Sequence, residues 1–211
     1  MELSSEVAAE RPVAIVGASA AGLFTAAGLA RAGRKVRVFE RADKINPASR
    51  TLIVTSRMRD LLGPAAEHSV VNQINRFELF TDGRSATVPL QEPDLIVERA
   101  KLIQGLAEDA QKAGVKLEMG RRFARLLPGE EGLELTVERT GAGARAVANE
   151  RIQCSAVVGA DGAQSAVAQA AGWNRQPTAP RVQALVGGRW GTQRAPTAPY
   201  AQQKASALPN S

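Results

Sequence analysis

The feature that most restricts the fold is a strand, a glycine-containing turn and a helix in direct succession near the start of the chain. Residues 13–16 form a continuous apolar run, which is typical of a strand buried on both faces. Gly17 ends this run, and residues 20–32 carry apolar side chains at helical spacing until Gly33 ends the helix. Residues 35–40 then alternate as a second strand. A unit of this size predicts two parallel strands joined by a right-handed crossover helix.

The turn of this unit has the spacing of a phosphate-binding loop. Its sequence, Gly-Ala-Ser-Ala-Ala-Gly, fits G-x-G-x-x-G except that Ser19 replaces the middle glycine. The first glycine permits a tight turn and the last allows helix and strand to pack closely, while backbone N–H groups at the start of the helix face a pyrophosphate. The Ser19 hydroxyl is a further donor for that phosphate. We predict that a dinucleotide binds to residues Gly17, Ala18, Ser19, Ala20, Ala21 and Gly22.

An acidic residue ends the second strand. Glu40 lies 18 positions after Gly22, where a carboxylate accepts hydrogen bonds from an adenosine ribose. A free 2′-hydroxyl is then preferred, which favours FAD or NAD over a 2′-phosphorylated cofactor. Arg41 follows Glu40 directly and weakens the argument against a 2′-phosphorylated cofactor, because an arginine accommodates a 2′-phosphate. We expect both Glu40 and Arg41 to contact the cofactor.

Beyond residue 46 the chain departs from a simple repetition of strand and helix. Two runs flank Asp82-Gly83 and predict an inserted β-hairpin around residues 77–90. A short helix is expected to begin at Thr55 or Ser56 and to stop at Gly63. The other expected elements are helices at 96–113 and 165–171 and strands at 52–54, 115–119, 123–127, 133–139, 144–149 and 152–158.

Composition divides the chain into three parts. We expect an N-terminal extension at 1–10, a cofactor-binding domain at 11–186 and a disordered tail at 187–211, where apolar periodicity is lost. The change at Gly187 suggests a truncated or frame-altered product, or a fragment. Sequencing the downstream DNA tests this hypothesis, since finding no related reading frame there would contradict it.

Charge and composition narrow the function classes. The net charge is +6, but the basic residues are spread along the chain and are not interleaved with aromatic residues, which make up only 4% of the sequence. We therefore expect no nucleic-acid partner. Residues 12–30 carry no charge and could be taken for a signal peptide or a membrane span. Three Glu residues precede this stretch, however, and much of it consists of small residues. We therefore expect no membrane span and a cytoplasmic protein. Cys154 is the single cysteine, expected as a buried thiol, and His68 has no companions at ligand spacing, so no metal site is predicted.

Two later segments carry a family resemblance. Residues 157–167, Val-Val-Gly-Ala-Asp-Gly-Ala-Gln-Ser-Ala-Val, resemble the G-x-D-G-x-x-S-x-V element of FAD-dependent aromatic hydroxylases and geranylgeranyl reductase-like oxidoreductases. Residues 97–102, Val-Glu-Arg-Ala-Lys-Leu, are similar to the V-x-R-x-x-L segment of the same superfamily. With the first glycine motif, the resemblance extends over residues 11–172.

The resemblance implies an α/β, Rossmann-like FAD-binding fold with a parallel central sheet and an inserted β-hairpin, C-terminally incomplete. It implies that Asp161 lies beside the FAD pyrophosphate and that Arg99 reaches the phosphate or ribityl region; Arg50 is a weaker candidate. A turn capped by Ser165 is the structural alternative for Asp161. The family's third element, resembling G-D-A-A-H, does not occur in this sequence.

The predicted function is an FAD-binding oxidoreductase of the monooxygenase or reductase type, with NAD(P)H as a possible reductant and a small molecule as substrate. We identify no catalytic residues, which suits an enzyme whose cofactor carries the redox chemistry. Two alternatives stay open: a non-catalytic dinucleotide-binding remnant and an NAD-dependent dehydrogenase. The sequence leaves the oligomeric state undetermined.

Overall fold

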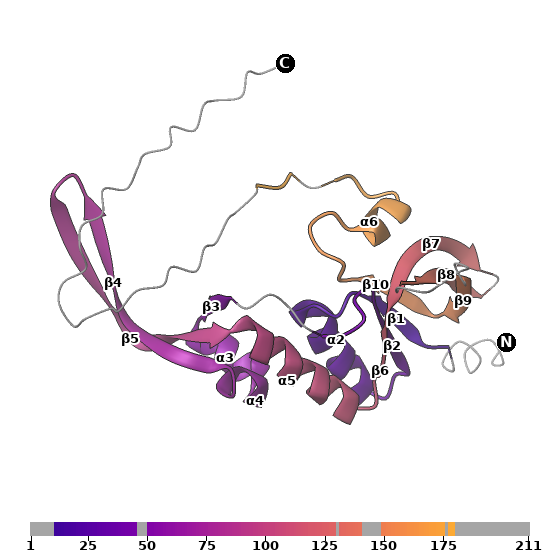
Figure 1. Ribbon diagram of the computed structural model, residues 1–211, viewed down its shortest axis with the longest axis horizontal. Coiled ribbons are helices and arrows are strands. Elements are labelled where there is room, and N and C mark those ends of the chain that lie inside the picture. Colours follow the sequence, from indigo (N-terminus) through magenta and orange to yellow (C-terminus); the bar gives the residue numbers. More distant parts are fainter. Residues whose placement is uncertain (1–10, 46–49, 130, 141–148, 176, 180–211) are drawn as a thin grey trace, which may run out of the picture. The chain divides into compact units, whose positions relative to one another are not determined.

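The computed structural model describes residues 11–45, 50–129, 131–140, 149–175 and 177–179 (Figure 1). These residues form three sheets and five helices. The predicted N-terminal extension, the predicted tail and the boundary at residue 186 lie outside them, as does most of the strand expected at 144–149.

The central sheet is parallel, in the order β10-β1-β2-β6. Its strands are β1 (Val13–Val16), β2 (Val36–Glu40), β6 (Lys116–Met119) and β10 (Ala156–Gly159). Helix α2 (Ala20–Arg31) joins β1 to β2. These two strands pair in parallel, and Val13 of β1 lies opposite Val36 of β2. This confirms the predicted unit of two parallel strands and a crossover helix.

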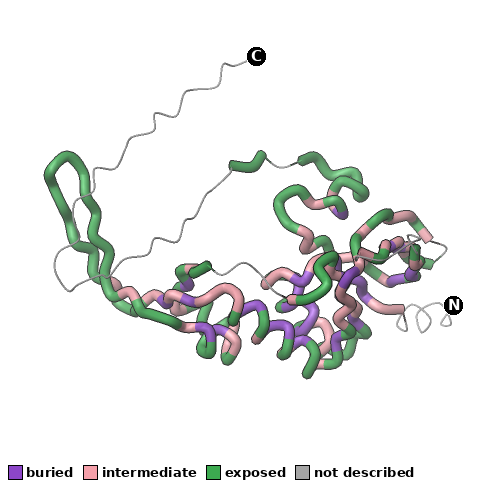
Figure 2. Tube along the Cα trace, viewed as in Figure 1, coloured by how far each residue is buried: buried purple, intermediate pink, exposed green. Residues whose placement is uncertain are grey.

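Alternation along β1 places its side chains in two separate cores. Val13 and Ile15 pack with α2 and with α5 (Arg99–Lys112) on one face of the sheet. Ala14 and Val16 pack on the other face against a second sheet. All four residues are buried, as predicted for a strand covered on both sides, and Figure 2 shows the buried segments gathered around these elements.

The second sheet is antiparallel, in the order β7-β8-β9. It consists of β7 (Arg121–Gly129), β8 (Gly132–Arg139) and β9 (Asn149–Cys154). Three residues of this sheet, Leu135, Val137 and Cys154, are fully buried where it packs against the central sheet. The burial of Cys154 confirms the predicted buried thiol. The central sheet therefore has helices on one face and the β7-β8-β9 sheet on the other.

The third sheet, in the order β3-β5-β4, contains the inserted hairpin. Strand β3 (Thr51–Val54) precedes α3 (Ser56–Leu62) and α4 (Pro64–Glu67), and the hairpin is formed by β4 (Val70–Thr81) and β5 (Arg84–Glu98). Both hairpin strands are longer than expected, because pairing continues through two register shifts that the sequence pattern does not mark. Much of the hairpin is exposed (Figure 2).

Two predicted elements are corrected by the structure, and one helix is added. The run at 152–158 is two strands, because Ser155 leaves the β7-β8-β9 sheet and donates its backbone N–H to the carbonyl of Pro12 (3.1 Å) before β10 joins the central sheet. The helix expected from Ile96 begins at Arg99, since residues 96–98 pair with β3. Helix α4 was not predicted; it begins with Pro64, directly after α3 has ended.

Candidate functional site

A cleft of about 830 Å³ opens where the strands of the central sheet end. Of the ten residues predicted to bind a cofactor, seven line this cleft: Gly17, Ala18, Ser19, Glu40, Arg41, Arg99 and Asp161. The other three, Ala20, Ala21 and Gly22, form the first turn of α2, which begins directly after Ser19. The topology thus gathers residues separated by up to 144 positions, because parallel strands present their carboxyl ends at one edge.

The start of α2 is held by a serine. The Ser19 hydroxyl accepts a hydrogen bond from the amide of Gly22 (3.2 Å), which makes Ser19 the N-cap of the helix. The same hydroxyl donates to the carbonyl of Ala160 (3.1 Å). Its single proton is therefore used inside the protein, and the expected donation from Ser19 to a phosphate is replaced by a contact between the two glycine motifs.

The glycines of the first motif are required by close approach. Gly17 has a φ of 103°, and a Cβ there would lie 2.5 Å from the carbonyl oxygen of Ala160. A Cβ on Gly22 would lie 2.1 Å from the carbonyl oxygen of Gly17. The turn can therefore fold in this way only without side chains at these two positions.

Glu40 lies against the glycine-containing turn. One carboxylate oxygen accepts from the amide of Ala18 (2.8 Å) and the other from the amide of Ala42 (3.0 Å). Backbone amides at the start of the helix were expected to face a pyrophosphate. The amide of Ala18 instead donates to Glu40, while the amides of Ser19, Ala20 and Ala21 have no acceptor within the part of the chain that the structure describes.

Asp161 caps the last helix, α6 (Ala166–Ala170). Its carboxylate accepts from the hydroxyl of Ser165 (2.5 Å) and from the amides of Ala166 (2.7 Å) and Val167 (3.2 Å). Ser165 in turn accepts from the amide of Ala168 (3.0 Å). The capped turn that we gave as the structural alternative is present, and it fixes the loop that forms one wall of the cleft.

Arg99 begins α5 and is close to a second arginine. Its amide donates to the carbonyl of Arg50 (2.9 Å), and no carboxylate pairs with either side chain among the described residues. Burial lowers the pKa of Arg99 below its ordinary value, and the positive charge of Arg50 lowers it further. Arg50 is exposed and does not line the cleft, whereas Arg99 does. A guanidinium without a carboxylate partner is suited to bind an anion.

One wall of the cleft is formed by residues that the motifs of the sequence did not indicate. Arg121, Arg122 and Phe123 line it from the start of β7, together with Lys44. The pair of arginines after Gly120 was a signal, but only the position of β6 beside β2 brings β7 to the end of Glu40's strand. The basic residues lining the cleft are Arg41, Lys44, Arg99, Arg121 and Arg122, against the acidic residues Glu40 and Asp161. This excess of positive charge favours a diphosphate.

Comparison with known proteins gives one family. Residues 10–197 match the family described as FAD binding domain. None of the curated proteins matches the chain.

Several solved structures resemble the chain over about three quarters of its length. The flavin-dependent monooxygenase PieE in complex with FAD and substrate has a TM-score of 0.63 at 22% identity, covering 77% of this chain and 32% of its own. OxyS anhydrotetracycline hydroxylase from Streptomyces rimosus has a TM-score of 0.62 at 23% identity, covering 77% and 34%. Aklavinone-11 hydroxylase with FAD and aklavinone has a TM-score of 0.59 at 24% identity, covering 77% and 35%. The chain spans about a third of the length of these proteins, and at these identities the likeness shows a common fold.

Among the described helices, none combines the length and the apolar character that crossing a membrane requires.

Proposed function

The chain belongs to the FAD binding domain family, and from this membership we propose that it is the FAD-binding part of a flavin-dependent monooxygenase. The observation that carries the proposal is the cleft in which the start of α2, Glu40 and the Asp161 loop meet. FAD is the cofactor of the family, and the cleft has the donors and acceptors that its ADP half needs.

The residues fit the cofactor in a definite order. The amides of Ser19, Ala20 and Ala21, together with the positive end of the α2 dipole, are suited to the pyrophosphate. Glu40 uses each carboxylate oxygen for one backbone amide, and the remaining lone pairs can accept from ribose hydroxyls. Arg41 lies beside this carboxylate in the same wall.

On the other wall we assign Arg99 to the phosphate or ribityl region as a charge-assisted donor. We assign Asp161 a positioning role. Its carboxylate already accepts from Ser165, Ala166 and Val167, so it holds the loop rather than the ligand.

The monooxygenase type is supported by the solved structures that resemble the chain, which include hydroxylases with FAD bound. When bound, FAD supplies the redox chemistry, and the protein contributes binding, orientation and exclusion of water. NAD(P)H as reductant, a small molecule as substrate and a cytoplasmic location belong to the same proposal.

Flavin binding by the purified chain tests this function. We expect the protein to quench FAD fluorescence on titration and ADP to compete with FAD, because the contacts described above involve the ADP half. Riboflavin, which lacks that half, should compete far less. If FAD binds but ADP does not compete, the assignment of the cleft is wrong.

A second candidate is nucleotide binding without turnover. It is supported by the cleft, because the contacts described above involve mainly the ADP half of the cofactor. Oxidation of NAD(P)H that depends on both FAD and an aromatic substrate would eliminate it. Binding of FAD with no such oxidation would support it.

A further inference from the structure

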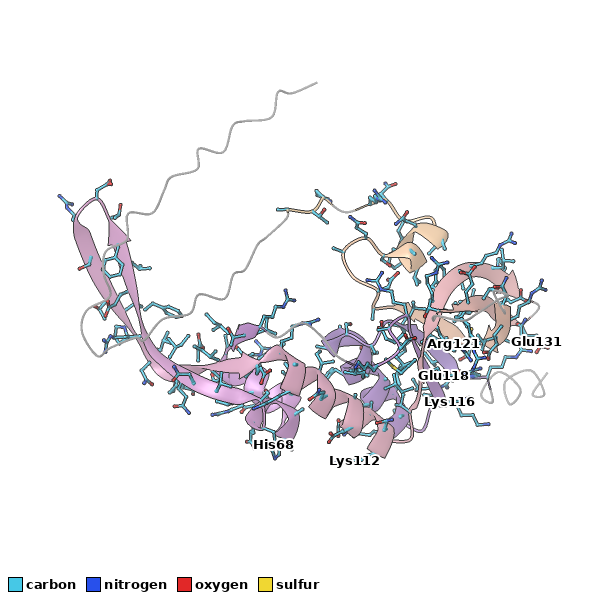
Figure 3. The ribbon with its side chains drawn as sticks, viewed as in Figure 1. His68, Lys112, Lys116, Glu118, Arg121 and Glu131 are labelled. Atoms are coloured by element: carbon cyan, nitrogen blue, oxygen red, sulfur yellow. The ribbon has the colours of Figure 1, made fainter. Side chains whose placement is uncertain are left out.

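A network of charged side chains lies beside the cleft, between the central sheet and the β7-β8-β9 sheet. Arg37 donates to Glu118 (2.6 Å) and to Glu150 (2.8 Å), and it also lies over the ring of Phe39 at 5.0 Å from the centroid. Glu150 uses its other oxygen to face Nε of Arg121 at 3.7 Å. Figure 3 shows Arg121 and Glu118 near one another in this region.

Arg37 is the fixed part of this network. The hydrogen bond that Arg37 donates to Glu118 raises the pKa of Arg37 above its ordinary value against the opposing effect of burial, and Glu150 adds to the rise. Burial alone would raise the pKa of Glu118, but the hydrogen bond and charge of Arg37 lower it on balance. Glu150 is therefore anchored at one oxygen by a cation that is itself held in place.

Arg121 is the part of the network that faces the cleft. Its side chain is 20% exposed and lines the wall next to Glu40. Its Nε is buried without a hydrogen-bond partner, and the described residues provide no acceptor for its other guanidinium nitrogens either. Glu150 thus restrains one edge of the guanidinium electrostatically, and the cleft is open to the rest of it.

A series of hydrogen bonds locates Arg121 relative to the ligand. Glu40 joins the amide of Ala18 to the amide of Ala42, and the carbonyl of Ala42 accepts from the amide of Gly120 (2.9 Å). Arg121 follows Gly120 directly. The order of contacts therefore runs from the glycine-containing turn through Glu40 to Arg121, which is the order of pyrophosphate, ribose and base in an adenine nucleotide.

We infer that Arg121 is a specificity-determining residue for the adenine base, and that Glu150 is the positioning residue that holds it. A planar guanidinium stacks on aromatic rings and donates in its own plane, which suits a neutral purine. A 2′-phosphate at the same place would face the carboxylate of Glu40, so the arginine is matched to the base. This inference rests on the proposed function and adds the recognition of one part of the same ligand.

The experiment compares FAD, ADP, inorganic pyrophosphate and 2′,5′-ADP on the full chain. Arg121→Lys keeps the charge and removes the plane, so we expect it to weaken FAD and ADP binding by about fivefold to tenfold and to leave pyrophosphate within about twofold. Arg125→Lys is the matched control, because Arg125 lies on the same strand outside the cleft. Thermal unfolding of each variant verifies that it is folded.

Glu150→Gln distinguishes positioning from contact. We expect it to weaken ADP in the wild-type background and to have little further effect in the Arg121→Lys background, because it acts through that guanidinium. Lys116→Gln, which removes an exposed charge from the same network away from the cleft, should leave ADP binding unchanged. An equal effect of Glu150→Gln in both backgrounds overturns the positioning role.

Other results separate this inference from the proposed function. If ADP competes with FAD but Arg121→Lys binds both like the wild type, only the inference fails. Equal weakening of ADP and pyrophosphate would make Arg121 a phosphate ligand, and tighter binding of 2′,5′-ADP than of ADP would make it a 2′-phosphate ligand; either result overturns the assignment to adenine. If the wild type binds neither FAD nor ADP, both proposals fail.

Discussion

Replacing Gly22 by alanine places a methyl group against the backbone that forms the phosphate loop. The new Cβ would lie 2.1 Å from the carbonyl oxygen of Gly17, whereas Cβ atoms are essentially never found within 3.0 Å of such an atom. Helix α2 and the end of β1 must therefore separate by about 1 Å, and such overpacking costs about 1–3 kcal/mol. For a domain of this size, where 1 kcal/mol corresponds to about 2–4 °C, the midpoint of thermal unfolding should fall by about 2–12 °C.

The same movement acts on the cofactor. Moving the start of α2 displaces the amides of Ser19, Ala20 and Ala21 together, so we expect ADP and FAD to bind at least about tenfold more weakly to Gly22→Ala, a loss of about 1.4 kcal/mol. The assays are thermal unfolding without ligand and fluorescence titration with FAD in competition with ADP.

Gly28→Ala is the matched control in the same helix. A Cβ on Gly28 meets nothing within 4 Å, and alanine is favoured over glycine inside a helix by about 1 kcal/mol. This variant should unfold at a temperature about 2–4 °C higher and should bind FAD like the wild type. If both variants change stability in the same direction, or if Gly22→Ala binds FAD normally, close packing of strand and helix is not what the glycine provides.

Three further predictions concern single side chains. Glu40→Gln should weaken ADP by about tenfold in titration, because a neutral amide accepts from ribose hydroxyls less strongly, and Glu40→Asp, which keeps the charge, should lose less. Glu118→Gln should reduce the free energy of unfolding by about 2 kcal/mol. Because the pKa of Glu118 is lowered in the folded state, the stability that this carboxylate contributes is complete above about pH 5 and is lost as the pH falls through the lowered pKa. The unfolding midpoints of the wild type and the variant should therefore converge in acid. Cys154 is fully buried and burial raises the pKa of its thiol, so Ellman's reagent at pH 8 should modify it only in denaturant; rapid modification of the native protein would contradict the described core.

Local sequence patterns predicted the parts of the fold that depend on neighbouring residues. The burial of β1, the position of α2 and the pairing of β1 with β2 were predicted from an apolar run, the glycine after it and helical spacing, whereas the capping of α2 by Ser19 was not. The break at Ser155 was not readable, because residues on both sides of it are apolar. What divides β9 from β10 is a hydrogen bond to Pro12, a residue more than 140 positions away.

For the site, the sequence by itself determined which chemistry is present: two glycine motifs, a carboxylate at the end of the second strand and arginines able to bind an anion. Only the tertiary structure decided how these groups are used. Glu40 occupies the amide of Ala18, Ser19 bonds to Ala160, and Asp161 caps α6, while Arg121 enters the cleft because β6 lies beside β2. Motif spacing is a property of the chain, but the partner of a donor or acceptor depends on which strands lie next to one another, and that follows from packing of the whole domain.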